Sequence, residues 1–186
     1  MLLQLIANHP QAVGTILKNT PTWVWGLFAG LMVLGFSQVR DRTASLARTA
    51  LVPVAMVGFS LWGIASGFGA SPQLGWVLAA WVAAATAVGV LVGRGPAAAG
   101  TEYDAATLSF RLPGSFVPLL LIVGIFLTKY AVGVELAMQP RLSADPTFGI
   151  EMAAVYGVFN GLFAGRAARV LRLAFRPGFR ANTAAA

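Results

Sequence analysis

The side chains best placed to do chemistry are ionisable groups inside otherwise apolar segments, namely Lys129, Glu135 and Glu151. Such a group costs several kcal/mol in hydrocarbon unless it is paired or hydrated. Lys129 and Glu151 are expected at similar depths on consecutive antiparallel helices, so one interpretation pairs them. The other lets Lys129 extend to the membrane surface. Glu135 lies about 120° around the helix from Lys129, which argues against a pair along one face.

Tyr156 and Asn160 are four residues apart and therefore share one face of a helix. An amide at this depth needs partners, and cross-helix hydrogen bonds worth about 0.6–2 kcal/mol are its ordinary explanation. The alternative is an outward-opening polar pocket that binds a ligand. Its candidate residues are Lys129, Tyr130, Glu151, Tyr156 and Asn160, with Trp62 and Trp81 as walls.

A run of arginines follows the last apolar segment: Arg166, Arg169, Arg172, Arg176 and Arg180. Their spacing places the first four on one stripe if the helix continues to Arg176, before Pro177 and Gly178 end it. This stripe suits anionic lipid headgroups, at about 1 kcal/mol per basic residue. Anchoring of the membrane topology is the simpler explanation of the same residues.

Composition excludes several classes of chemistry. The 186 residues are 58% hydrophobic and only 10% charged, which is typical of a chain built for lipid. The net charge of +7 flanks apolar segments and forms no soluble basic face, so no nucleic-acid partner is expected. Without cysteine, and with His9 as the only histidine, the chain is expected to hold no metal or other cofactor.

Hydropathy predicts the elements that position these residues. The fold class expected is an all-α polytopic membrane protein with five transmembrane helices and an N-terminal interfacial helix. Residues 1–20 form the interfacial segment, 21–176 the transmembrane domain, and 177–186 a disordered tail. The spans are expected at about 23–39, 51–68, 74–92, 116–134 and 148–165. The loop from 94 to 114 is predicted to be irregular, with a short strand-like or helical piece near 107–111.

Small residues at four-residue spacing predict close helix packing. The most persuasive set is Gly157, Gly161 and Gly165, because it repeats along one stripe. Shorter pairs occur at Gly26 and Gly30, Gly63 and Gly67, and Gly89 and Gly93. Packing within the chain is the favoured interpretation for most of them.

The distribution of basic residues predicts the orientation. With an external N-terminus, ten arginines lie on the inner side of the membrane and three basic residues on the outer side. The N-terminus is therefore expected in the periplasm and the C-terminus in the cytoplasm. The five tryptophans and Tyr130 then fall in the outer half, as an aromatic belt would.

Three stretches carry a resemblance to a known family: PTWVWGLFAG from Pro21, SFVPLLLIVGIFLTKYAVGVELAMQP from Ser115, and VYGVFNGLFAGRAARVLR from Val155. Together they resemble a family of small bacterial integral membrane proteins catalogued as a domain of unknown function. The resemblance covers nearly the whole chain. It implies a bacterial inner-membrane location, and it carries no activity, substrate or catalytic residue.

Packing signals outnumber chemical ones, so we expect a non-enzymatic accessory or self-associating membrane subunit. Its partners would be membrane lipids, including anionic headgroups, together with a second copy or another membrane protein. The alternative is a small-solute transporter or oligomeric channel that uses the outward-facing polar pocket. A lipid-modifying enzyme using Glu135 and Glu151 ranks third.

Overall fold

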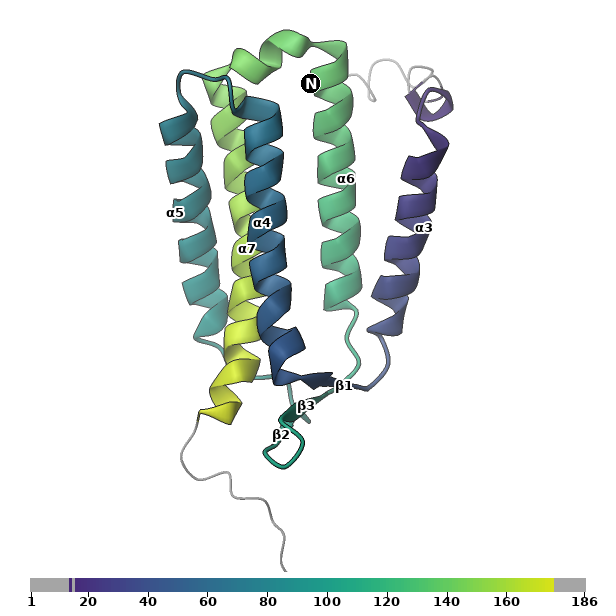
Figure 1. Ribbon diagram of the computed structural model, residues 1–186, viewed down its shortest axis with the longest axis vertical. Coiled ribbons are helices and arrows are strands. Elements are labelled where there is room, and N and C mark those ends of the chain that lie inside the picture. The colour runs from purple at the N-terminus through teal and green to yellow at the C-terminus, as the bar shows by residue number, and fades with distance from the viewer. Residues whose placement is uncertain (1–13, 15, 176–186) are drawn as a thin grey trace, which may run out of the picture.

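A bundle of long helices with a small sheet at one end makes up the structure, a computed structural model that describes residue 14 and residues 16–175 (Figure 1). We call the end that carries the sheet the sheet end. The opposite end carries the short helix η1 and is the η1 end. In chain order the elements are α3 (Thr22–Ser37), β1 (Arg42–Ser45), α4 (Leu46–Phe68), α5 (Leu74–Gly93), β2 (Glu102–Asp104), β3 (Ser109–Leu112), α6 (Val117–Met138), η1 (Pro140–Ala144) and α7 (Pro146–Ala174).

Four of the described helices, α4, α5, α6 and α7, are long and apolar enough to cross a membrane. The segment predicted as the first span, 23–39, forms helix α3, which is apolar but has only 16 residues and is not one of these four. At 1.5 Å per residue α3 rises about 24 Å, short of a hydrocarbon core of about 30 Å. The predicted interfacial segment lies mostly outside the described residues, and Arg176 and the tail 177–186 lie wholly outside them.

Side-chain caps explain where two helices begin. Asp145 accepts hydrogen bonds from the backbone N–H groups of Thr147 and Phe148, at 2.8 and 3.3 Å. With Pro146 in the first helical position, this starts α7 two residues before the predicted span. Ser45 caps α4 in the same way, through a 3.3 Å hydrogen bond from the Arg48 N–H, so α4 begins five residues earlier than predicted.

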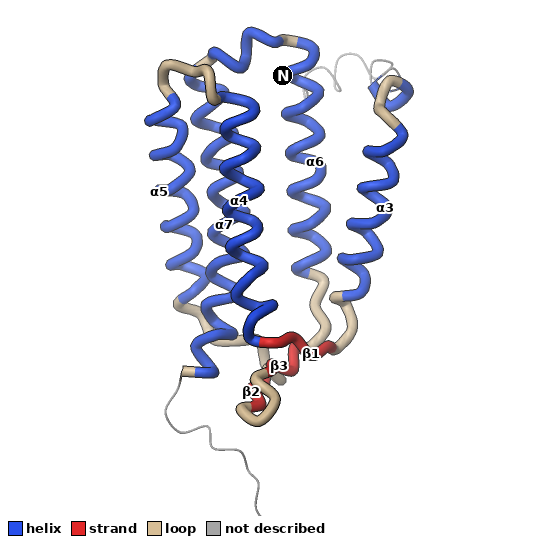
Figure 2. Tube along the Cα trace, viewed as in Figure 1, coloured by secondary structure: helices blue, strands red, loops and turns tan. Residues whose placement is uncertain are grey.

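The all-α expectation is incomplete, because the loops at the sheet end form a three-stranded antiparallel sheet in the order β1-β3-β2 (Figure 2). Arg42 pairs with Leu112 across β1 and β3, and Glu102 pairs with Arg111 across β2 and β3. Phe110, at the centre of β3, is fully buried. The sheet thus joins the chain leaving α3 to the chain entering α6.

The turn between β2 and β3 is held by Asp104. Its carboxylate accepts hydrogen bonds from the Ala106 N–H at 2.9 Å and from the Thr107 hydroxyl at 2.7 Å. These bonds, that of Thr107 foremost, lower the pKa of Asp104 below its ordinary value. Such a side-chain turn helps to order the loop, which the sequence predicts to be irregular apart from a short strand-like or helical piece near 107–111, where the structure has β3.

The helices pack in two groups. α7 contacts both α5 and α4, and these three helices enclose a core of Ile64, Val77, Trp81, Ala153 and Tyr156. α6 pairs mainly with α3 and has fewer contacts with α7 (Figure 1). Since α5 and α7 both run from the η1 end to the sheet end, they form a parallel pair although α6 separates them in sequence.

Candidate functional site

Lys129 lies where α4, α6 and α7 meet. Its ammonium group is 4.5 Å from the centre of the Tyr156 ring, a cation–π arrangement. Gly63 on α4 makes room for it, because an added Cβ there would overlap the Lys129 ammonium group. The same Cβ would lie 3.8 Å from Cε2 of Tyr156. We call Gly63, Lys129 and Tyr156 the lysine junction.

The lysine junction lies well inside the helices. Lys129 is about 18 Å along α6 from its first residue and about 13 Å from its last. A partly buried ammonium at this depth is costly, and a cation–π contact returns about 0.5–2 kcal/mol. The contact with Tyr156 therefore offsets only part of the cost of placing the Lys129 ammonium group at this depth.

Asn160 adds a polar group one turn beyond Tyr156 on α7. Its side chain is only 7% exposed, and its Nδ2 donates to the Tyr156 carbonyl at 2.8 Å. Its Oδ1 is buried and has no hydrogen-bond donor among the described residues. A buried acceptor of this kind costs about 1–3 kcal/mol, which favours a ligand group or water beside it.

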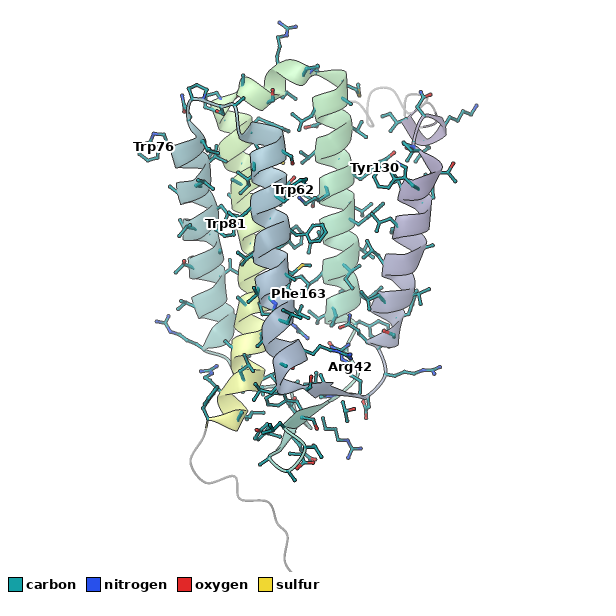
Figure 3. All side chains as sticks on the ribbon, in the orientation of Figure 1. Arg42, Trp62, Trp76, Trp81, Tyr130 and Phe163 are labelled. Atoms are coloured by element: carbon teal, nitrogen blue, oxygen red, sulfur yellow. The ribbon has the colours of Figure 1, made fainter. Side chains whose placement is uncertain are left out.

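The two tryptophans expected to wall a pocket have different environments (Figure 3). Trp81 is 9% exposed, and its indole N–H donates to the Ser60 hydroxyl at 3.0 Å. Trp62 is 74% exposed on the outer surface of α4. Only Trp81 therefore belongs to the core next to the lysine junction. Ser60 and Gly63, which complete this region, were not among the predicted ligand residues.

Tyr130 and Glu151 lie away from the lysine junction. The Tyr130 hydroxyl shares a 2.5 Å hydrogen bond with the Thr20 hydroxyl, so this ring faces the α3 side of α6 (Figure 3). Glu151 is exposed, and its position on α7 is about 140° around the helix from Tyr156. Lys129 lies against Tyr156 and not against Glu151, the partner that one of the two interpretations of Lys129 gave it. The structure thus brings together Lys129, Tyr156, Asn160 and Trp81 from the predicted set.

The glycine stripe of α7 faces α5. An added Cβ on Gly161 would lie 2.6 Å from the Ala85 oxygen, and one on Gly165 would lie 2.8 Å from the Gly89 oxygen. Gly157 is equally crowded, with the Ala84 Cβ 2.9 Å from its own added Cβ. These glycines let the backbones of α5 and α7 approach closely, as small residues do in membrane helix pairs.

Two of the tail arginines bind the end of α5. Arg172 donates to the carbonyls of Gly93 and Gly95, and Arg169 donates to the carbonyl of Pro96 at 3.4 Å. Arg166 is partly buried one turn earlier on α7. Arg42, on β1, is also at the sheet end (Figure 3). Burial is the main cause that lowers the pKa of Arg42 below its ordinary value, and the nearby charge of Arg48 lowers this pKa further.

Four described helices that are long and apolar enough to cross a membrane indicate a helical membrane protein. The chain matches the Family of unknown function (DUF6622) over residues 1–180, and it belongs to that family. No curated protein and no solved structure gives a significant match. The family has no assigned activity.

Proposed function

We propose that this chain is a five-span, non-enzymatic membrane subunit that associates with a second copy of itself through α3. The observation that carries the proposal is an open glycine face on α3. Gly26 and Gly30 have no atoms within 4 Å of an added Cβ, whereas Gly161 and Gly165 are fully covered by α5. A partner helix would cover the α3 glycines in the same way.

The open face of α3 lies opposite its contact with α6. Gly35 packs on Leu119, with an added Cβ 3.3 Å from the Leu119 Cα, and the rings of Phe28 and Phe126 are 4.7 Å apart. Gly26 lies about 180° around the helix from Gly35, and Gly30 about 140°. One side of α3 therefore holds α6, and the other is free for a further helix.

Length and symmetry support the same conclusion. A helix of about 24 Å is shorter than the hydrocarbon core, and association with another helix relieves this mismatch. A two-fold axis along the membrane normal would place two α3 helices in parallel, with Gly26 and Gly30 facing their own copies. The chain already uses a parallel glycine-to-glycine contact, between Gly89 on α5 and Gly161 on α7.

Leucines on this face should abolish the association. We expect the wild type to be a dimer and Gly26→Leu/Gly30→Leu to be a monomer, measured by single-molecule photobleaching in liposomes. Gly58→Leu is the matched control, since Gly58 on α4 also has open space around it. A monomeric wild type at every protein density would refute self-association. Crosslinking of that monomer to another membrane protein would assign α3 to an accessory role.

We further propose that the sheet end faces the cytoplasm of a bacterial inner membrane and that the N-terminus is periplasmic. Among the described residues, the sheet end carries eight arginines, while Lys18 and Arg141 are at the η1 end. This asymmetry supports a cytoplasmic sheet end. Trp76, which is 71% exposed near the η1 end of α5, suits an outer aromatic belt (Figure 3).

The absence of cysteine makes this orientation simple to test. Single cysteines replacing Arg111 and Arg141 would be treated with a membrane-impermeant maleimide on intact spheroplasts. We expect Arg141→Cys to react, and Arg111→Cys to react only after permeabilisation. Labelling in the reverse order would overturn the orientation without touching the proposal for α3.

A second candidate function, the binding and passage of a small anion, is favoured by the lysine junction. Lys129, whose ammonium group lies over the Tyr156 ring, supplies the positive charge that would attract the anion. Glu151 is exposed and has no place in this version of the predicted pocket.

A further inference from the structure

Three arginines line a hollow at the sheet end of the α5–α7 pair. The hollow has a volume of about 320 Å³, and Arg94, Arg169 and Arg172 surround it together with Pro96, Ala97 and Leu173. Arg94 comes from the end of α5, and the other two arginines come from the last turns of α7. No Asp or Glu is among the residues that line it.

The positions of two of these guanidinium groups are fixed by hydrogen bonds. Arg172 donates to the carbonyls of Gly93 and Gly95, and Arg169 donates to the carbonyl of Pro96. A guanidinium has five N–H donors, so each group keeps donors for a ligand. The Nε of Arg169 is buried and has no acceptor among the described residues. The hollow thus combines positive charge, preorganised donors and an unused donor.

From this geometry we propose that the hollow binds a phosphate group. The ligand we favour is the phosphodiester of an anionic lipid headgroup, because membrane lipids surround the protein. Arginine forks match the oxygen geometry of phosphate, and a volume near 320 Å³ accommodates a phosphate with a small polar substituent. Ala97 and Leu173 supply an apolar wall for the neighbouring carbon atoms. The inference is independent of helix association through α3.

The test measures the binding of lipid and the binding of free phosphate in separate experiments. Protein in nanodiscs of phosphatidylcholine with added phosphatidylglycerol is released in a native mass spectrometer, and bound phosphatidylglycerol is counted. We expect Arg94→Gln to weaken binding about fivefold and Arg94→Gln/Arg169→Gln/Arg172→Gln about a hundredfold. Calorimetric titration of the detergent-solubilised protein with inorganic phosphate forms the second arm. Binding there that the same substitutions weaken would identify a soluble phosphate ligand.

A matched control removes the same charge elsewhere at the sheet end. Arg40→Gln/Arg48→Gln/Arg111→Gln should leave both measurements unchanged, which separates a built site from general attraction to basic protein. Because Arg172 also holds the end of α5, the single variant Arg94→Gln decides the result if the triple variant does not fold. Equal binding by wild type and Arg94→Gln in both arms would overturn the proposal.

Discussion

Replacing Gly161 by leucine is expected to lower the free energy of unfolding by about 3 kcal/mol, the upper end of the usual cost of overpacking. An added Cβ would lie 2.6 Å from the Ala85 oxygen and 2.8 Å from the Gly89 nitrogen. These are backbone atoms, which cannot move aside without separating α5 from α7. Gly161→Ala should lower the free energy of unfolding by less than Gly161→Leu does, because alanine adds only the Cβ atom.

The quantity to measure is the thermal unfolding midpoint of the protein in a mild detergent. Unfolding is monitored by fluorescence-detected size-exclusion chromatography. Gly133→Leu on α6 is the control, since Gly133 has no atoms within 4 Å of an added Cβ. We expect its midpoint to match the wild type. An unchanged midpoint for Gly161→Leu would show that α5 and α7 do not touch along this stripe.

Lys129→Met is expected to reduce anion passage by about ten- to a hundredfold if the lysine junction has the second candidate function. This range corresponds to the loss of one charged hydrogen bond worth about 1.5–3 kcal/mol. Chloride is the probe, and its entry into protein-containing liposomes is followed with an enclosed fluorescent indicator. Glu151→Gln should leave the rate unchanged, because Glu151 is exposed away from Tyr156.

A stability measurement keeps this result interpretable. Methionine is apolar and fills a volume similar to that of the lysine chain, so Lys129→Met should unfold at the wild-type temperature or above it. If Lys129→Met passes chloride more slowly than the wild type but unfolds at the same temperature or above it, the result would support anion passage through the lysine junction. Equal chloride entry into liposomes with wild type, Lys129→Met or no protein would eliminate this function.

Much of the fold could be predicted from the sequence, because hydropathy directly reports which segments prefer lipid. The α5 bounds, Leu74–Gly93, differ from the predicted 74–92 by one residue. The strand β1 could not be predicted, because its four residues, RTAS, show no alternation and pair with residues that follow two helices later. Such pairing depends on tertiary contacts that local patterns do not record.

The candidate site was predicted less completely, because the sequence does not fix how each helix is rotated about its own axis relative to its neighbours. Spacing gives the depth of a side chain and its angle relative to others on the same helix. It does not give the rotation of one helix against the next. Lys129 and Glu151 were therefore placed at similar depth, yet Lys129 contacts Tyr156 and Glu151 is exposed. Gly63, which admits the lysine side chain, became recognisable only from the α4–α6 geometry.

The parallel contact between α5 and α7 also dictates an order of events during biosynthesis. Gly93 and its counterpart Gly165 are separated by about 70 residues, so α5 leaves the ribosome long before its main partner exists. At about 5–20 residues per second, the delay is on the order of several seconds. During that interval α5 must remain among lipids or insertion factors, with its glycine face unoccupied.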